Sequence, residues 1–281
     1  MAYRSIFVGP IFDSHLAEQT PAPSLVDYAL ELSSLLNAHL TVGVGACKFA
    51  AASAGIVRAA ADLIAIANRE RGEQAEKFGA AMLTRSHSAG VEASLELVHA
   101  EYGNVADRLA RLARVSDVAL LEPSDEALSL MQGIVQEVLF GSGRPVIIVP
   151  RIWNKPASLE TIIVSWDGSA KAARAVGDAM PLLAKAESVE VVSVSGDADE
   201  TKNMDGTDIA AHLSRHCRRV SVTCLPTQGD VGETLRSHAA NTRASLLVMG
   251  AFAHNRLRQF VLGGVTRRML SDPPLPVLMS Y

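Results

Sequence analysis

The chain has 281 residues, of which 48% are hydrophobic and 20% charged, and its formal net charge at pH 7 is −4. This length allows one large domain or two ordinary ones, and the apolar content suffices for a buried core, which excludes a disordered chain. The slight acidic excess argues against a broad nucleic-acid-binding surface, which would need an excess of Lys and Arg. Aromatic residues make up only 5%, which favours closely packed helices and parallel strands over an aromatic-rich β-sandwich.

The N-terminal sequence and the cysteines indicate the compartment. The first residues lead almost directly into an apolar run and lack the basic segment, apolar stretch and cleavage site of a signal peptide. No segment reaches about 18 uninterrupted apolar residues, so we expect no transmembrane helix. Cys47, Cys217 and Cys224 lack CxxC or metal-ligand spacing and suit a reducing environment. We therefore predict a cytoplasmic protein with neither a membrane nor a nucleic acid as its partner.

Short apolar runs alternate with stretches of helical periodicity in the first half of the chain, up to residue 150. Leu25, Tyr28, Leu32 and Leu36 have the spacing of one helix face. The apolar runs are continuous, as expected for strands that are covered on both faces. In chain order, the sequence predicts a strand at 5–9, a helix at 24–37, a strand at 39–45, a long helix at about 55–88, a strand at 92–98, a helix at 103–114, a strand at 117–121, a helix at 128–140 and a strand at 145–149.

The second half of the chain follows the same plan with a shorter segment between its second and third strands. Residues 196–206 in that segment are polar, and we expect them to form an exposed, mobile loop. The predicted elements are a strand at 160–165, a helix at 169–184, a strand at 188–194, a short helix at 207–216, a strand at 219–225, a helix at 230–241, a strand at 245–249, a helix at 264–271 and a strand at 275–279. This alternation predicts an α/β fold with doubly wound parallel sheets.

An internal repeat relates the two halves. Residues 131–149 and 262–280 each contain a glycine, an apolar helical stretch, a Pro-Val step and a short apolar strand. Gly133 aligns with Gly264 in this comparison. A repeat of this length indicates a duplicated domain rather than a solenoid unit.

The match continues upstream of these segments. The run that starts at Gly103 resembles the run that starts at Gly229, and both openings are a strand followed by an aspartate, Asp13 or Asp167, with Ser close behind. The polar linker at 151–158 separates the two copies. We therefore assign one domain to 1–152 and the other to 157–281.

Segment 248–270 contains the parts of a phosphate site. A strand ends at Gly250, and Gly263-Gly264 opens a helix that has Thr266 in its first turn. Glycines there leave backbone N–H groups accessible to an anion, and the helix dipole favours negative charge at that point. The loop between is basic, with His254, Arg256 and Arg258.

This segment resembles the carboxyl-terminal signature of the universal stress protein family. In the family's nucleotide-binding members, a glycine, two residues, a second glycine, nine residues and a third glycine precede Ser or Thr. Here the glycine positions fall on Gly250, Ala253 and Gly263, and the hydroxyl position falls on Gly264. The resemblance covers nearly the whole chain, twice. It implies two tandem Rossmann-like domains, similar to adenine nucleotide alpha hydrolases, that form an intramolecular pseudo-dimer.

The resemblance also implies that the second half binds an adenine nucleotide, namely ATP, with or without Mg²⁺. The aspartate would hold the base or ribose, and the backbone N–H groups and the hydroxyl of Thr266 would hold the phosphates. The implied site comprises Asp167, Val194, Met249, Gly250, Ala253, His254, Gly263, Gly264, Val265 and Thr266. The sequence shows no general base and no metal-ligand cluster, so we predict no catalytic residue, no metal site and, at most, slow ATP hydrolysis.

The first half departs further from the family pattern. Glu122 occupies the position of Gly250, and the loop 122–126 contains three acidic residues that would repel a triphosphate. We therefore interpret this half as a degenerate copy that supports the fold and the pairing of the halves.

Other interpretations of these residues remain open at this point. Gly263-Gly264 could form a tight turn without a ligand, and Asp167 could cap the helix that follows it. The altered signature is also compatible with a module that binds a small apolar ligand or a protein partner instead of a nucleotide. An enzyme that acts on a phosphorylated metabolite is a third reading. The sequence leaves open whether the chain also forms a homodimer.

Overall fold

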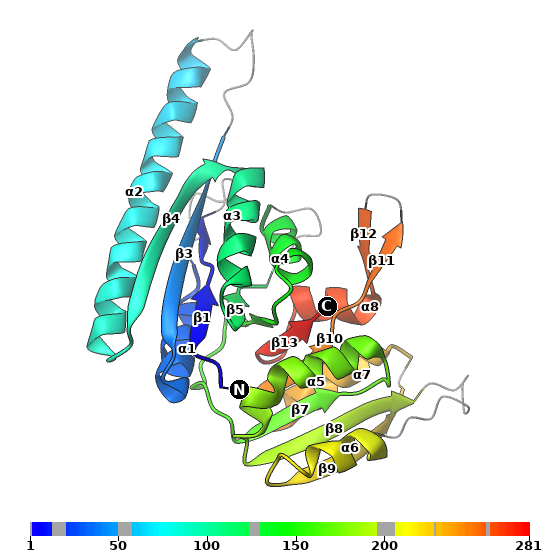
Figure 1. Ribbon diagram of the computed structural model, residues 1–281. Helices are drawn as coiled ribbons and strands as arrows, with labels where there is room; N and C mark the ends of the chain where they lie inside the picture. Colours follow the sequence, from blue (N-terminus) through cyan, green and yellow to red (C-terminus); the bar gives the residue numbers. More distant parts are fainter. Residues whose placement is uncertain are drawn as a thin grey trace.

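The computed structural model describes residues 2–12, 21–49, 58–123, 130–195, 206–227, 229–256 and 259–281, with the backbone alone at 58–60, 130, 253–256 and 259–262. Figure 1 shows two α/β units that meet along a shared sheet, one coloured blue to green and the other green to red. The α/β fold with a mostly parallel sheet, predicted from the sequence, is thereby confirmed.

The first half contains six strands and four helices among its described residues. The continuous apolar runs form short buried strands, and the helices pack one apolar face on them. The elements are β1 (Ser5–Val8), β2 (Ile11–Phe12), α1 (Pro23–Leu36), β3 (His39–Lys48), α2 (Arg58–Ser88), β4 (Ala93–Glu101), α3 (Tyr102–Arg114), β5 (Val118–Leu121), α4 (Leu130–Gly141) and β6 (Val146–Ile148).

The second half repeats this order with a shorter helix between its second and third strands and an added hairpin. The elements are β7 (Thr161–Ser165), α5 (Ala170–Leu183), β8 (Ser188–Ser195), α6 (Thr207–Leu213), β9 (Val220–Pro226), α7 (Val231–Asn241), β10 (Leu246–Gly250), β11 (Ala253–Arg256), β12 (Gln259–Leu262), α8 (Gly264–Ser271) and β13 (Val277–Ser280).

One sheet of 11 strands runs through both halves. The first half contributes the order β4-β3-β1-β5-β6, with the short β2 also paired to β3, and the second half contributes β13-β10-β7-β8-β9. Neighbours within each half are parallel, whereas β6 and β13 pair antiparallel, with Ile147 opposite Leu278. The strands of the two halves therefore run in opposite directions, and their carboxyl ends lie at opposite edges of the common sheet.

Each face of the sheet has a hydrophobic core that continues across the β6–β13 junction. One core joins buried residues of α1, α2, α5 and α6 to the sheet, and the other joins those of α3, α4, α7 and α8. Ile147 and Leu278 are both fully buried in the first of these cores. The halves thus share their cores and do not merely touch through a linker.

Polar contacts repeat across the junction in matched positions. The Tyr3 hydroxyl donates to the carbonyl of Asp178 at 2.6 Å, and the Ala157 N–H donates to Glu31 Oε2 at 2.7 Å. Glu31 and Asp178 are both the ninth residue of a 14-residue helix, α1 or α5. This pseudo-two-fold arrangement agrees with an intramolecular pseudo-dimer.

The structure differs from the predicted elements in three places. The basic loop expected after Gly250 contains an antiparallel hairpin, β11–β12, and the pair Ile11–Phe12 forms an additional strand. The β11 sequence, Ala253–Arg256, lacks the apolar alternation that indicates a strand. The short helix expected at 207–216 ends at Leu213, where Ser214 begins tighter turns. The predicted mobile loop falls on 196–205, outside the described residues.

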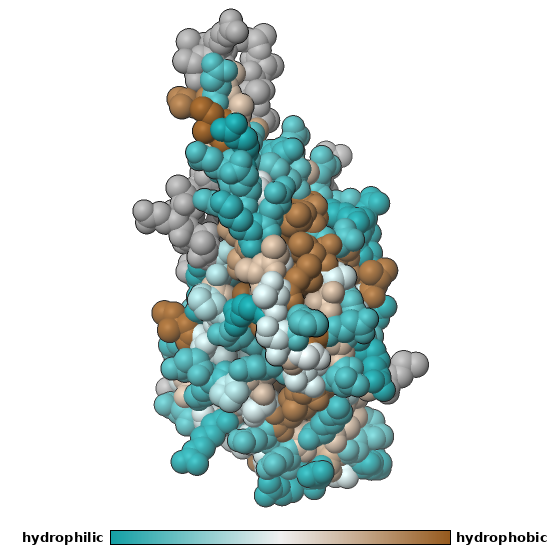
Figure 2. Space-filling view, turned by 90° about the vertical axis from the view of Figure 1, so that its left-hand side faces the viewer, coloured by the Kyte–Doolittle hydropathy of each residue, from teal (hydrophilic) through white to brown (hydrophobic). Residues whose placement is uncertain are grey.

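Helix α2 is much longer than its counterpart α6, and one end stands beyond the sheet (Figure 1). Figure 2 shows the face that carries this helix, which is largely hydrophilic, with a hydrophobic group near the projecting end. Leu63 and Ile66 of α2 are exposed at 67% and 44%. None of the described helices is long and apolar enough to cross a membrane.

Removing a junction side chain tests whether the halves share one core. We expect Leu278→Ala to lower the free energy of unfolding by about 2–5 kcal/mol, because the truncation leaves a cavity where the two halves meet. Urea denaturation measures this change. Leu63→Ala is the matched control on the exposed part of α2, with an expected change within about 0.5 kcal/mol. Equal effects of the two substitutions would contradict a shared core.

Candidate functional site

Asp167 lies directly beyond the carboxyl end of β7, in a turn that the local sequence explains. Gly168 has a φ of 73°, a left-handed conformation that glycine adopts without strain. Asp167 Oδ1 accepts the N–H of Ser169 at 3.0 Å, and Ser169 Oγ in turn accepts the N–H of Ala172 at 3.1 Å. Ser169 is therefore the N-cap of α5, and the capping role considered for Asp167 is not observed. The exposed carboxylate of Asp167 faces solvent at the edge of the sheet.

Two buried polar groups without partners lie beside this turn. Trp166 and Ser193 are adjacent across β7 and β8, where the Trp166 N–H donates to the Val192 carbonyl at 2.8 Å. The side chains are exposed by only 9% and 7%, and Trp166 Nε1 and Ser193 Oγ have no hydrogen-bond partner among the described residues. Val194, the predicted backbone contact, follows directly and is half-buried. Buried donors without acceptors are uncommon in folded proteins and need an explanation.

Gly250 ends β10 at a point of close backbone contact. A Cβ atom there would lie 2.7 Å from the backbone N of Ala172 and 2.7 Å from the carbonyl carbon of Lys171. Met249, which precedes it, is exposed by only 4%. Glycine at 250 thus lets the first turn of α5 rest on the end of β10, which fixes the edge next to Asp167.

The start of α8 has open space above it. A Cβ atom on Gly264 would meet no atom of the described residues within 4 Å, whereas one on Gly263 would lie 3.3 Å from Phe252 Cβ. The Gly263 N–H donates to the Phe252 carbonyl at 3.0 Å, which ties the end of the hairpin to its beginning. Of the two glycines, Gly264 leaves room for a ligand, and half-buried Val265 follows it in the first turn.

Thr266 does not offer its hydroxyl at the surface as we expected. Its side chain is exposed by only 1%, and Oγ1 accepts the N–H of Phe252 at 2.9 Å. The hydroxyl therefore holds the loop that follows β10 against the first turn of α8. The hydroxyl is buried because Thr266, the third residue of α8, faces the interior of the protein. The Thr266 hydroxyl is thus engaged within the chain and is not exposed to a ligand.

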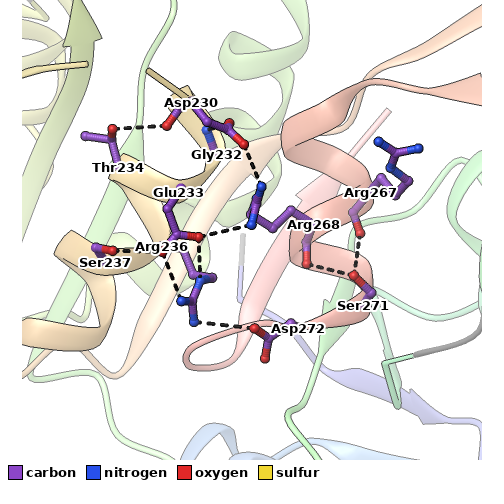
Figure 3. A network of polar contacts seen from close by, with 10 residues as sticks. All are labelled: Asp230, Gly232, Glu233, Thr234, Arg236, Ser237, Arg267, Arg268, Ser271 and Asp272. Atoms are coloured by element: carbon purple, nitrogen blue, oxygen red, sulfur yellow. Dashed lines mark hydrogen bonds and ion pairs between the residues drawn. The ribbon is translucent and has the colours of Figure 1, made fainter. Parts of the chain in front are cut away.

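A charged network fastens α8 to α7 (Figure 3). Asp230 caps α7, since its Oδ1 accepts the Gly232 N–H at 2.8 Å. Arg268 of α8 donates to Asp230 Oδ2 at 2.6 Å and to Glu233 Oε2 at 3.0 Å. Arg236 pairs with Glu233 at 3.0 Å and with Asp272 at 3.4 Å. These hydrogen bonds lower the pKa of Glu233, chiefly through Arg236.

The first half differs at the equivalent positions. Glu122 has a buried carboxylate that accepts the Ala22 N–H at the start of α1 and forms an ion pair with Arg151. Burial raises the pKa of this carboxyl, while Arg151 and the Ala22 N–H oppose that rise. Gly133 lies inside α4, and a Cβ atom there would lie 1.8 Å from the Tyr102 hydroxyl. The two glycine positions of the first half are thus filled by its own side chains.

Some of the expected residues lie beyond what can be described. Asp13, Arg258 and residues 124–126 fall outside the described residues. Ala253, His254 and Arg256 belong to β11, but only their backbone is described. The structure therefore brings Asp167, Val194, Gly250 and the start of α8 to one edge of the sheet. The basic side chains of the hairpin are outside what the structure describes.

Comparison with known proteins finds a family that the second half resembles. The model of the universal stress protein family matches residues 158–280. A universal stress protein of Synechocystis sp. is 23% identical over 198 residues, which are 68% of this chain and 66%, just under two thirds, of that protein.

Solved structures extend the likeness in fold to the whole chain. A universal stress protein from Archaeoglobus fulgidus has a TM-score of 0.68 at 17% identity, and the match covers 98% of this chain and 97% of that one. A protein of unknown function from Pseudomonas aeruginosa has a TM-score of 0.55 at 14% identity, with coverage of 99% and 92%. The chain thus shares the fold of these solved structures along nearly its whole length.

One cation beside the site could not be predicted from the sequence. Lys171, in the first turn of α5 next to Gly250, has its Nζ 3.1 Å from the centroid of the Tyr281 ring. Tyr281 packs edge-to-face on Phe140 of the first half, with 4.8 Å between the ring centroids. Partial burial, followed by Arg174, lowers the pKa of Lys171. The residue comes from a helix far from the signature, so the signature could not indicate it.

The two key glycines are expected to respond differently to the same substitution. Gly250→Ala places a methyl group against the backbone of α5, and we expect it to lower the free energy of unfolding by about 1–3 kcal/mol. Gly264→Ala places the methyl group in open space, and we expect a change within about 0.5 kcal/mol. Thermal or urea unfolding of both variants measures the difference. Equal stability of the two variants would show that α5 does not rest on Gly250.

Proposed function

We propose that the second half binds one adenine nucleotide, ATP, at the carboxyl edge of β7, β8 and β10, and that it does so without efficient catalysis. The observation that carries this proposal is the open N-terminus of α8 on the same edge as the exposed carboxylate of Asp167. Open parallel sheets bind ligands at this edge. The match of residues 158–280 to the model of the universal stress protein family supports a nucleotide as the ligand. We infer a cytoplasmic role in the stress response.

The start of α8 fits the phosphate end of such a ligand. The first N–H groups of a helix have no partner within the helix, and they favour an anion together with the helix dipole. Gly264 has no Cβ to cover them, and a Cβ atom there would meet none of the described residues within 4 Å. Here the missing hydroxyl of the family signature costs one side-chain donor but leaves the backbone donors in place.

The carboxyl ends of β7 and β8 fit the nucleoside end. An exposed carboxylate such as Asp167 accepts hydrogen bonds from ribose hydroxyls or from the amino group of the base. Trp166 Nε1 and Ser193 Oγ, which have no partner among the described residues, lie directly before Asp167 and Val194 and keep polar groups close to this end. The described residues thus fit a nucleotide that lies between Asp167 and Gly264, with or without Mg²⁺.

We propose a single site for each chain. In the first half, the Glu122 carboxylate occupies the start of α1, and Gly133 packs inside α4 instead of opening it. An additional phosphate would meet a buried carboxylate there rather than free N–H groups. This assignment extends the interpretation of domain 1–152 as a degenerate copy.

A side chain placed over the start of α8 tests the phosphate end. We expect the native chain to bind one ATP, and Gly264→Val to lose saturable binding, because the new side chain covers the N–H groups without meeting other atoms. Calorimetric titration with ATP, with and without Mg²⁺, measures stoichiometry and affinity. Gly103→Val is the matched control, since its Cβ also meets nothing within 4 Å. No saturable binding by the native chain up to millimolar ATP would overturn the proposal.

Removal of the exposed carboxylate tests the nucleoside end. We expect Asp167→Ala to weaken ATP binding by about 10- to 100-fold, since hydrogen bonds to a charged group contribute about 1.5–3 kcal/mol. The affinity for inorganic triphosphate should stay within about twofold, because the carboxylate does not hold phosphates. Asp208→Ala, in the first turn of α6, serves as the control. Equal losses for ATP and triphosphate would place Asp167 at the wrong end of the ligand.

A further inference from the structure

Asp230 brings a negative charge close to the proposed phosphate site. A Cβ atom on Gly232 would lie 3.2 Å from Asp230 Oδ1 and 3.3 Å from Cα of Val265, in the first turn of α8. The carboxylate is therefore closer to that turn than the Debye length of about 8 Å at physiological salt. Hydrogen bonds from the Gly232 N–H and from Arg268 lower the pKa of Asp230, so the group is ionised at neutral pH. Without compensation, this charge would oppose an anion at the start of α8.

Arg268 supplies that compensation from within α8. Its guanidinium reaches back between the two helices and pairs with Asp230 at 2.6 Å and with Glu233 at 3.0 Å (Figure 3). Arg236 holds the opposite side of Glu233 and also Asp272 at the end of α8. The network thus contains three carboxylates and two guanidinium groups, and Arg268 is the cation that faces Asp230.

We propose that Arg268 is a positioning and charge-compensating residue for the phosphate site, acting through Asp230 rather than through contact with the ligand. The inference rests on the proposed nucleotide function and assigns the specificity for anions to a pair of side chains outside the glycine signature. Arg268 anchors the first turn of α8 against α7 and cancels the carboxylate that caps α7. The α7 cap and the α8 anion site can therefore coexist side by side.

This proposal predicts that one substitution rescues another. We expect Arg268→Met to weaken ATP binding about 3- to 10-fold at low salt, because the bare Asp230 carboxylate then repels the phosphates. The loss should shrink as the salt concentration rises, since exposed charges are screened. In the double variant Asp230→Asn with Arg268→Met, affinity should return to within about twofold of the native value. Asn still caps α7, because Asn and Asp are comparable at the N-cap.

Two further variants keep the test decisive. Asp230→Asn alone should bind ATP about two- to fivefold more tightly, since Arg268 is then less neutralised. Arg236→Met removes a cation from the same network at the other end of α8, and its affinity should stay within about twofold. Calorimetric titration of each variant at low and high salt, with thermal unfolding to establish folding, provides the measurements. If the double variant binds as weakly as Arg268→Met, the role is purely structural and the proposal is overturned.

Inorganic triphosphate serves as a second probe that separates this inference from the proposed function. If the native chain binds triphosphate but not ATP, the proposed nucleotide function is overturned. The role of Arg268 and Asp230 is then tested by the affinity of the same variants for triphosphate. If it binds ATP and Arg268→Met leaves both affinities unchanged, the inference falls and the nucleotide function stands. If the native chain binds neither probe, both are overturned.

Discussion

The antiparallel pairing of β6 with β13 is the interaction on which the rest of the molecule depends. A parallel sheet exposes strand edges that readily pair with another chain, and each half alone would end in such an edge. The pairing joins the two edges into one continuous sheet and lets both hydrophobic cores run across it. Because the join is antiparallel, the carboxyl edges of the halves point in opposite directions. A ligand site at one edge is thereby independent of the other, and the two copies are free to differ in chemistry.

In the first half, the chain's own side chains occupy the carboxyl edge of the sheet. Glu122 lies where the second half has Gly250, and its carboxylate takes the Ala22 N–H at the start of α1. The ion pair with Arg151 connects this buried group to the residues that follow β6. Ser24 Oγ donates to the carbonyls of Pro150 and Arg151 at 2.9 Å and 3.0 Å. The same edge therefore anchors the linker between the halves.

Sequence reasoning recovered the features that depend on local pattern. The strands were predictable because both faces are covered, which leaves continuous apolar runs, and the duplicated plan was predictable from the aligned glycines. The β11–β12 hairpin was missed, because the His254–Arg256 run carries no apolar alternation. The buried position of Thr266 depends on which way the third residue of α8 faces, and the spacing in the signature does not contain that information.

The ion pairs that join α7 to α8 could not be predicted from a sequence pattern, for a different reason. Arg268 is 38 residues from Asp230 and 35 from Glu233, so only the packing of the two helices brings them together. The same holds for Lys171 and Tyr281, which meet because α5 rests on the end of β10. Local motifs predicted where an anion would bind, whereas the charges that tune that position are set by tertiary contacts.

The charge balance of the second-half edge follows from these contacts. A helix N-terminus attracts an anion through backbone dipoles, and that attraction is worth little beside an uncompensated carboxylate at the same surface. Asp230 nevertheless caps α7, whose first turn packs against that of α8 with only Gly232 between them. A cation must therefore lie where it can neutralise the cap without covering the helix end. Arg268, in the second turn of α8, meets both conditions, because its guanidinium pairs with Asp230 and Glu233.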